Sequence, residues 1–514
     1  MTQNRKRAAA GFGRGGWLGV VVAAGAALAA WDFCAAQSTG GKPNLLIITI
    51  DTMRADHLGC YGYFRDTSPH IDALAKESIF FERCITPMAQ TLPVHTSIFT
   101  GVYPREHGIV ANIAQGGLYK PSDTLMTFAS AVAKQGYHTA GFVSAEPVKK
   151  IGGIAAGFEY WYEPADKKVE ADWTNKKIFE WADGGGLKEP FFMWVHYFDP
   201  HANYEPPPPY DTMFTSDEAL DRYMRERGFG EEGTKERSGD KEKAVVKVKK
   251  SKESINLYDG EVRWTDENIG KLFAKLKEKG VWDKTIIVIT GDHGEGLGQH
   301  NLTGHGNIWH EQLHVPLMMR IPGQAPRKVA TPITSPDILP TLLALVPTLP
   351  AGDFLKQTTG VNVLAPDHKA DRPLYAQLPG SRTVMVQSLT VGDWRYIMHP
   401  KGDRLFNLKD DPYELKNVLE QNKERATQMR KELERIVHEQ MALGQKHGGG
   451  QILKNAETSK AVRNLEGLGY GEEGTEEDDH PEYDDGHDHG DEGKKKAGAG
   501  EKTEKTKKEK KDDE

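Results

Sequence analysis

The stretch Thr285–Gly306, TIIVITGDHGEGLGQHNLTGHG, predicts a buried strand that ends in a polar, glycine-rich loop. Its β-branched run, Ile286–Ile289, is short and stops at Gly291, which is typical of a strand inside a parallel sheet. Open α/β sheets bind their ligands at the carboxyl ends of the strands. Asp292 and His293 therefore stand where such a fold carries out its chemistry.

Two other apolar runs end in the same way. Asn44–Ile50, NLLIITI, is followed directly by Asp51. The third run, Phe191–Val195, is followed at short spacing by His196, Asp199 and His201. The glycine-rich loop after the first run adds Glu295, His300 and His305. Three strands that deliver carboxylates and imidazoles to one edge of a sheet favour a metal site over the alternative, polar loops without an ion.

Thr91–Gly101, TLPVHTSIFTG, predicts a helix with Pro93 in its first turn and Gly101 as its stop. Thr91 is expected just before the helix N-terminus, where free N–H groups and the helix dipole favour an anionic group. A hydroxyl beside a divalent cation loses its proton more easily and becomes a nucleophile. The alternative is that Thr91 only caps the helix, and this stretch alone favours that interpretation.

Helices and strands alternate along the rest of the chain, which predicts an α/β fold whose parallel or mostly parallel sheet is covered on both faces. Strands are expected at residues 139–144 and from residue 315 onward, and helices at 123–135, 172–181, 256–279 and 335–346. The main domain is expected to span residues 42–370, with a charged surface insertion at 211–252. A smaller C-terminal subdomain is expected at 371–445. Its expected elements are short strands at 383–389 and 395–398 and a charged helix at 420–439.

The two ends of the chain differ from the middle in composition. Residues 1–36 have a basic start and an apolar run, which predicts a cleaved signal peptide or a retained N-terminal anchor, and hence export to the periplasm or the cell exterior. Cys60 and Cys84 would remain after cleavage, as one disulfide or as two buried thiols. Residues 469–514 are low in complexity and predict a disordered, charged tail. The net charge of −8 gives no indication of a nucleic-acid partner.

From about residue 42 to 439 the chain resembles the sulfatase family of the alkaline-phosphatase superfamily. The matching pieces are NLLIITIDTMRADHLG at 44–59, the stretch 91–101 with YPREHG at 103–108, HYFDPH at 196–201, YDGE at 258–261, GDHGE at 291–295, VPL at 315–317, and LFNL with the later Asp-Pro at 405–412. The resemblance implies a large α/β/α domain with a smaller C-terminal antiparallel sheet and helix, which agrees with the expectation above.

The resemblance also assigns roles to residues of this chain. It implies that Asp51, Asp292 and His293 bind a metal ion together with Thr91, and that Thr91 also takes the position of the catalytic nucleophile. Four further residues would bind the anionic group of the substrate, protonate the leaving group or hold a second metal: His196, Asp199, His201 and His305. His95 belongs with the substrate-binding or second-metal residues.

The pattern departs from the family at the nucleophile. Sulfatases carry Cys, or sometimes Ser, in a Cys-x-Pro-x-Arg pattern and oxidise it to formylglycine. Here the residues are Thr91-Leu92-Pro93-Val94-His95, and oxidation of Thr would give a ketone. Thr is similar to the phosphodiesterase, pyrophosphatase and transferase branches of the superfamily, in which a metal-activated Thr attacks phosphorus. His293 replaces the Asn of calcium-type sulfatases, so Zn²⁺ or Mn²⁺ is favoured over Ca²⁺ or Mg²⁺, with one or two ions per chain.

The sequence therefore predicts an exported, metal-dependent hydrolase or transferase that uses Thr91 to attack phosphate or sulfate esters, with phosphoesters and phosphodiesters favoured. The substrate would be a small molecule or a glycan or lipid ester, and any membrane contact would be through an uncleaved N-terminal segment. Two alternatives remain: a sulfuric ester hydrolase acting on sulfated glycans or aryl sulfates, and a relative that binds glycans or anions without turnover.

Overall fold

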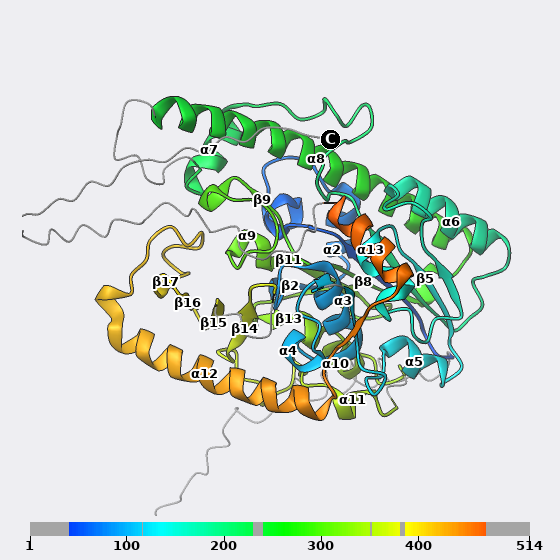
Figure 1. The fold of residues 1–514 in the computed structure, drawn as a ribbon. Helices are drawn as coiled ribbons and strands as arrows, with labels where there is room; N and C mark the ends of the chain where they lie inside the picture. Colours follow the sequence, from blue (N-terminus) through cyan, green and yellow to red (C-terminus); the bar gives the residue numbers. More distant parts are fainter. Residues whose placement is uncertain (1–40, 116, 230–239, 350–351, 381–385, 469–514) are drawn as a thin grey trace, which may run out of the picture. The chain divides into compact units, whose positions relative to one another are not determined.

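The computed structural model describes residues 41–115, 117–229, 240–349, 352–380 and 386–468 (Figure 1). The predicted signal peptide or anchor at residues 1–36 and the predicted tail at 469–514 lie outside the described residues. Among the helices within the described ranges, none combines the length and the apolar character that crossing a membrane requires.

Three predicted strands form the centre of a mixed sheet. β1 (Asn44–Ile50) pairs in parallel with β8 (Thr285–Gly291) on one side and with β7 (Phe191–Tyr197) on the other. The strand order is β12-β2-β11-β8-β1-β7-β5-β6, and β13 also pairs with β2. The outer strands are β2 (Ile79–Ile85), β5 (His138–Phe142), β6 (Tyr160–Tyr162), β11 (His314–Arg320), β12 (Arg327–Val329) and β13 (Ile333–Thr334). Only the pairings of β11 are antiparallel within this sheet as described, so the expectation of a mostly parallel sheet is confirmed.

The two faces of the sheet pack against separate helical layers. Because side chains alternate along a strand, β1 directs Leu45 and Ile47 to one face and Leu46, Ile48 and Ile50 to the other. The first face packs against α3 (Thr91–Thr100), α5 (Phe128–Ala133) and α10 (Ile338–Leu345). The second packs against α2 (Pro69–Ala75), α6 (Ala171–Asp183), α7 (Glu218–Glu226) and α8 (Asp240–Glu278). The predicted three-layer α/β/α fold is confirmed.

The starts of two helices differ most from their predicted positions. α8 begins at Asp240 rather than at 256, because its first part is charged and carries no apolar periodicity that a sequence can reveal. With α7, whose N-cap Asp217 accepts a hydrogen bond from Leu220 N, it makes the predicted insertion at 211–252 partly helical. α5 begins at Phe128 rather than at 123, because Thr127 caps it.

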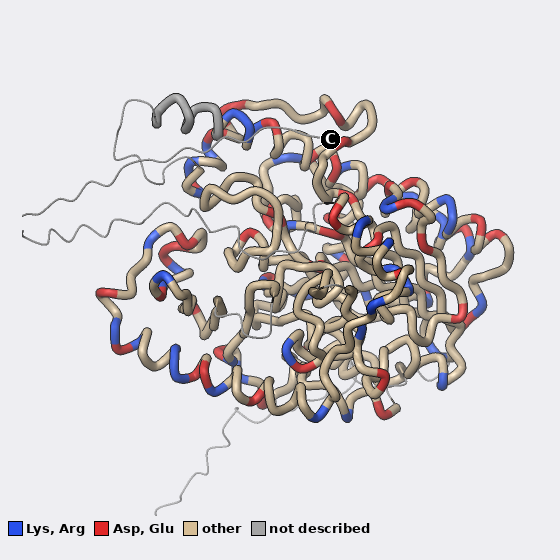
Figure 2. Tube along the Cα trace, in the orientation of Figure 1, with Lys and Arg blue, Asp and Glu red and all other residues tan. Residues whose placement is uncertain are grey.

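A second, antiparallel sheet lies in the C-terminal part, as predicted. It consists of β14 (Leu374–Gln377), β15 (Gln387–Val391), β16 (Trp394–Met398) and β17 (Arg404–Asn407) in that order. α12 (Lys423–Lys446) packs Met429 and Leu433 against Leu389 and Tyr396 of this sheet. Figure 2 shows acidic and basic residues interspersed along α12, in agreement with the charged sequence from which the helix was predicted.

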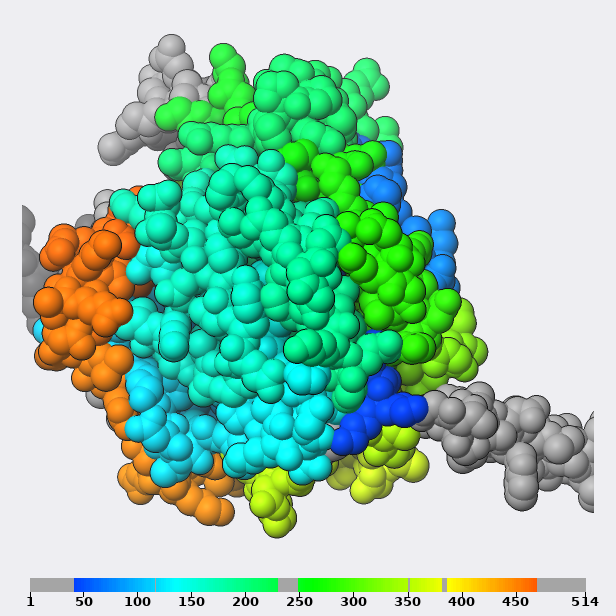
Figure 3. Space-filling model, turned by 90° about the vertical axis from the view of Figure 1, so that its right-hand side faces the viewer, coloured from blue at the N-terminus to red at the C-terminus, as the bar shows by residue number. Residues whose placement is uncertain are grey.

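The chain continues beyond the predicted subdomain and returns to the main domain. β18 (Gln451–Leu453) pairs with β4 (Gly117–Lys120), which also pairs with β3 (Ile113–Ala114). α13 (Ala456–Glu466) then packs Ala461 and Leu465 against Leu118. Figure 3 shows this last described segment, in orange, against the cyan part of the chain. The remaining short elements are α4 (Pro104–His107), α9 (His310–Leu313), α11 (Phe354–Gln357), β9 (Gly296–Leu297) and β10 (Thr303–Gly304).

Both described cysteines are free thiols, Cys60 half-buried and Cys84 buried. Of the two alternatives that the sequence left open, the structure therefore contains two thiols rather than one disulfide.

Candidate active site

The ends of the two central strands β1 and β8 bring three predicted metal ligands together. His293 Nε2 lies 3.8 Å from Asp51 Oδ1 and 3.6 Å from Asp292 Oδ2, and all three side chains are fully buried. One ligand atom from each of the three lies within 4.8 Å of the others. The parallel register, which pairs Ile50 with Gly291, places Asp51 and Asp292 side by side where both strands end.

The chemistry of these atoms fits a divalent cation. His293 Nδ1 lies 3.0 Å from Gly294 O, and a carbonyl can only accept, so Nδ1 carries the proton and Nε2 presents a lone pair to the carboxylates. Within the described ranges, Asp292 Oδ2 and both carboxylate oxygens of Asp51 have no hydrogen-bond partner. Buried carboxylates facing an imidazole lone pair are costly unless a cation lies among them.

The pKa values of the carboxyl groups reflect the same crowding. Burial raises the pKa of Asp51 well above its ordinary value, and the neighbouring charges of Asp292 and Glu295 raise it further. Burial also raises the pKa of Asp292 to about 6. Asp292 Oδ1 accepts hydrogen bonds from His293 N and Thr52 N at 2.7 and 3.2 Å, so Oδ2 is the oxygen directed at the cluster.

Thr91 lies at the edge of this cluster as the first residue of α3. Its Oγ1 is 3.4 Å from His293 Nε2, and the residue is fully buried. The helix cap is Gln90, not Thr91, so the alternative that gave Thr91 only a capping role is wrong. Asn112 Oδ1 instead accepts from the first-turn N–H of Leu92 at 2.8 Å.

His95 lies one helical turn after Thr91, and its ring is held by protein atoms on both sides. Nδ1 is 2.8 Å from Thr91 O and 3.7 Å from Asp292 Oδ2. Nε2 is 2.9 Å from Thr49 Oγ1, which also accepts from Trp194 Nε1 at 2.9 Å. His95 is therefore beside the cluster and supports the first turn of α3.

The other predicted histidines form a row that leads away from His293. The ring centroids of His293 and His305 are 4.7 Å apart, and those of His305 and His201 are 5.0 Å apart. His305 Nδ1 lies 3.7 Å from Glu295 Oε1, and 12% of the His305 side chain is exposed. On the other side of the cluster, His196 Nε2 lies 3.5 Å from Asp51 Oδ2.

Two candidate ligands are engaged in hydrogen bonds outside the cluster. Asp199 Oδ2 accepts from Ala171 N at 2.8 Å, at the start of α6, and burial raises the pKa of this carboxyl to about 6. His300 Nδ1 lies 3.0 Å from Glu311 Oε1, and its ring stacks on Trp309 at 3.9 Å. Asp199 and His300 are of residue types that bind metals, but both form hydrogen bonds with neighbouring protein groups instead.

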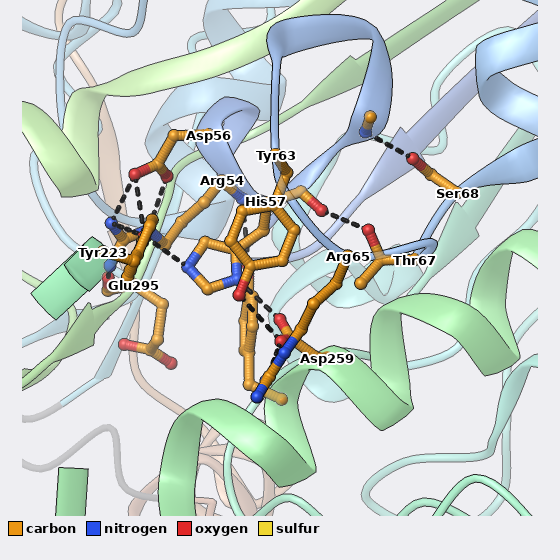
Figure 4. Close-up of polar contacts among 12 residues, drawn as sticks. Arg54, Asp56, His57, Tyr63, Arg65, Thr67, Ser68, Tyr223, Asp259 and Glu295 are labelled. Carbon is orange, nitrogen blue, oxygen red and sulfur yellow. Dashed lines mark hydrogen bonds and ion pairs between the residues drawn. The ribbon is translucent and has the colours of Figure 1, made fainter. Parts of the chain in front are cut away.

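Sequence reasoning gave no role to Arg54 and His57, which anchor the loop after β1 (Figure 4). Arg54 is 1% exposed, and its Nη1 donates to Glu295 O and Gln299 Oε1, both at 3.1 Å, so it ties this loop to the loop after β8. His57 Nδ1 lies 2.7 Å from Asp259 Oδ1 on α8. The available signal was the charged sequence RADH directly after a buried strand, because such charges need buried partners.

Tyr258, next to Asp259 on α8, forms hydrogen bonds with backbone groups of the same loop. Its hydroxyl donates to Thr52 O at 2.7 Å and accepts from Arg54 N at 3.0 Å. Thr52 has a positive φ of 49°, a conformation that is unfavourable for a β-branched residue. The helix therefore fixes the backbone on which Asp51 is mounted.

Known proteins resemble this chain over most of its described length. The family model described as Sulfatase matches residues 43–348. The ulvan-active sulfatase of Formosa agariphila is 27% identical over 418 residues, which cover 74% of this chain and 78% of that protein.

Two solved structures share the fold. The yidJ protein of Bacteroides fragilis, a candidate sulfatase, aligns with a TM-score of 0.66 at 21% identity over 79% of this chain and 97% of its own. The phosphonate monoester hydrolase of Agrobacterium radiobacter aligns with a TM-score of 0.59 at 19% identity over 80% of this chain and 100% of its own. At these identities the likeness is one of fold.

Proposed function

The chain belongs to the sulfatase family of the alkaline-phosphatase superfamily, a family of metal-dependent ester hydrolases, and on this premise we propose that Thr91 is its nucleophile and that phosphate esters are its preferred substrates. The observation that carries the proposal is the Thr91 hydroxyl, 3.4 Å from His293 Nε2 at the N-terminus of α3. Because Thr cannot give the formylglycine aldehyde, the hydroxyl itself must attack. Diesters are expected to be the best substrates.

Asp51, Asp292 and His293 would hold the cation, which when bound lowers the pKa of a neighbouring hydroxyl and offsets negative charge on the ester oxygens. Thr91 Oγ1 attacks the phosphorus, and the new Thr–O–P bond forms as the bond to the leaving oxygen breaks. The N-terminus of α3 would direct the positive end of its dipole at the transferred group. The N–H groups of Leu92 and Val94 already donate to Asn112 Oδ1 and Gln90 O, and Pro93 has none.

His305 is the best placed of the three candidate histidines to protonate the leaving oxygen. It is partly exposed, whereas His196 and His201 are buried, and the Glu295 carboxylate 3.7 Å away would stabilise its protonated form. Water then attacks the phosphorus of the Thr91 ester and releases the threonine oxygen. An alcohol in place of water would make the same site a transferase.

A sulfuric ester hydrolase that uses Thr91 directly is the second candidate. It is favoured by the 27% identity to an enzyme named for activity on ulvan, in an alignment that covers 74% of this chain and 78% of that protein. Sulfated glycans or aryl sulfates would then be the substrates. With either substrate class, we retain the proposal of export, which rests on the composition of residues 1–36.

A panel of aryl phosphate monoesters, aryl phosphodiesters and aryl sulfates, each with Zn²⁺, Mn²⁺, Mg²⁺ or Ca²⁺, tests the proposal. We expect the highest kcat/KM with a phosphodiester and Zn²⁺ or Mn²⁺. A clear preference for sulfate would favour the second candidate. Stoichiometric metal binding with no turnover of any ester would favour a binding protein without catalysis and would contradict both enzyme proposals.

A further inference from the structure

We propose that a cavity at the edge of the main sheet binds a small organic anion with an aromatic body. The cavity has a volume of about 560 Å³, within the range of ligand pockets, and it is lined by α2, the segment after β1 and the outermost strand β12. β12 is four strand-to-strand steps from β1, which is about 19 Å at roughly 4.8 Å per step. The cavity is therefore distinct from the metal-ligand cluster, and the inference goes beyond the proposed function.

Part of the cavity wall is apolar and rigid. Phe80 and Ala75, which are 5% and 9% exposed, line it together with Pro326. Phe80 belongs to the hydrophobic core on the α2 side of the sheet, and its ring centroid is 4.6 Å from that of Tyr61. A ring that is fixed in this way can pack against a flat apolar ligand without a further loss of side-chain entropy.

The same cavity has an excess of positive charge. Lys76, Arg327 and Lys328 line it with a single carboxylate, that of Asp72, so its lining residues carry a net charge of +2 in a chain whose net charge is −8. The register of β12 pairs Lys328 with Phe80, and Lys328 Nζ lies 5.8 Å from the centroid of that ring. The local charge attracts an anion that the protein as a whole repels.

The Asp72 carboxylate is directed at the loop rather than at the cations. Its Oδ1 accepts from Cys60 N at 2.7 Å and from Ser68 Oγ at 3.0 Å. A Cβ atom on Gly59 would clash with Asp72 Oδ2, so this oxygen packs against the backbone of the same loop. Asp72 therefore serves to hold the segment after β1.

The cations of the cavity have no carboxylate partner. Glu77, which follows Lys76 directly, lies 3.2 Å from Arg320 Nε instead. Within the described ranges, no ion pair joins Lys76, Arg327 or Lys328 to a carboxylate. Outer strands often carry basic residues that prevent association with another sheet, which accounts for those of β12. It does not account for Lys76, which comes from the end of α2 and lines the same cavity.

The two halves of the wall select one chemical class. An aryl sulfonate, aryl carboxylate or aryl phosphate can place its ring against Phe80 and its negative charge beside Lys76 and Lys328. An uncharged ring would gain nothing from the cations, and an inorganic anion would gain nothing from the apolar wall. The occupant is therefore an aromatic anion of low molecular mass.

Anilinonaphthalene sulfonate, an aromatic anion whose fluorescence rises on binding, is the probe for a titration of the full-length protein. We expect Lys76→Gln combined with Lys328→Gln to weaken its binding at least about 10-fold, because two of the attracting charges are lost. Lys409→Gln combined with Lys416→Gln is the matched control. It removes two exposed charges from the C-terminal subdomain and should leave the affinity unchanged. Equal affinities in the two double variants would overturn the inference.

Two other ligands test the chemical class. The uncharged analogue N-phenylnaphthylamine should bind at least about 10-fold more weakly than the sulfonate, because it lacks the charge. Inorganic phosphate should displace the sulfonate only at a concentration at least about 10-fold above that of the probe, because it buries no apolar surface. Binding of the uncharged analogue as tight as that of the sulfonate, or displacement by equimolar phosphate, would contradict the assigned class.

Asp292→Asn tests the location. The variant should bind anilinonaphthalene sulfonate as the wild type does, because the cavity lies about 19 Å away from the strand that carries the metal-ligand cluster. If Asp292→Asn loses the probe while the Lys76→Gln and Lys328→Gln double variant retains it, the probe binds at the active site and the inference is wrong.

Discussion

The two carboxylate oxygens of Asp292 have different partners: Oδ1 accepts from backbone N–H groups, and Oδ2 faces the metal-ligand cluster. A substitution can therefore remove the negative charge and keep the backbone hydrogen bonds. In Asp292→Asn the amide oxygen can still accept from Thr52 N and His293 N, as Oδ1 does now. We expect the variant to remain folded and to bind Zn²⁺ at least about 100-fold more weakly, because a carboxylate ligand is lost. Metal content after dialysis, with circular dichroism as the folding control, checks this. Undiminished metal content would exclude Asp292 as a ligand.

Glu106 gives the protein a pH dependence that is separate from the metal site. It is buried, accepts hydrogen bonds from Tyr103 N and Thr359 Oγ1, and burial raises its pKa to about 7 from an ordinary value of 4.5. The folded state therefore binds a proton more tightly than the unfolded state. The stability from this group is complete below pH 4.5 and is lost as the pH rises towards 7.

Glu106→Gln should remove this slope. Between pH 4.5 and 8 the wild type should lose up to about 3 kcal/mol of unfolding free energy relative to the variant. Urea unfolding of both proteins across this range measures the difference. Parallel pH profiles for the wild type and Glu106→Gln would show that the pKa of Glu106 is the same in the folded and unfolded states and would contradict the prediction.

At the scale of elements, the active site depends on a helix that contributes no predicted ligand. α8 holds the loop after β1 through Tyr258, whose hydroxyl bonds both Thr52 O and Arg54 N. Tyr258→Phe would leave these buried backbone groups without that partner, so we expect a loss of about 1–3 kcal/mol in unfolding free energy. Zn²⁺ affinity should fall as well, because Asp51 precedes the loosened residues.

Tyr137→Phe is the control for this prediction. Its buried hydroxyl donates to Pro43 O at 2.8 Å, before β1 begins rather than after it ends. Chelator competition and urea unfolding of both variants should show a stability cost in each but weaker zinc binding only in Tyr258→Phe. Equal zinc affinities in the two variants would show that the contacts of Tyr258 on α8 do not support the metal site.

At the scale of the whole molecule, the C-terminal residues fall into two parts. β18 and α13 pack on the main domain, and the composition of residues 469–514 predicts that they do not pack. Deletion of 469–514 should leave activity and the melting temperature nearly unchanged, because that composition cannot bury enough apolar surface. Deletion of 447–514 also removes β18 and α13, and with them the contact of Leu465 and Ala461 with Leu118. We expect this longer deletion to lower the melting temperature by roughly 2–5 °C.

Differential scanning calorimetry of the two truncations provides the measurement. A large drop for the shorter deletion would mean that the predicted tail packs on the folded chain. No drop for the longer deletion would mean that β18 and α13 contribute nothing to stability.

The part of the site that the sequence predicted well is the part encoded locally. Asp51 and Asp292 follow short apolar runs, and the period and length of those runs are enough to predict strands whose ends meet. The direction in which a side chain points is not determined by the local sequence alone. Asp199 lies just beyond the strand that carries His196, yet it accepts a hydrogen bond from Ala171 N, a partner from another segment of the chain.

Long-range partners explain the remaining differences. The start of α8 is charged and gives no periodic signal, and the return of β18 to β4 joins segments that are more than 300 residues apart, as Ile452 and Tyr119 are. Arg54 could be recognised as needing a partner, but Gln299 and Glu295 could not be identified from spacing. Topology, rather than propensity, decided these contacts.

The most direct test of the central claim is the rate of Thr91→Ala relative to wild type on the aryl phosphodiester that the wild type turns over fastest, at saturating Zn²⁺. Loss of the only proposed nucleophile should lower kcat by at least about 1000-fold, and Thr91→Ser should recover part of it because a hydroxyl remains beside His293. A Thr91→Ala rate within about tenfold of wild type, in a protein that is folded and binds zinc, would contradict the account.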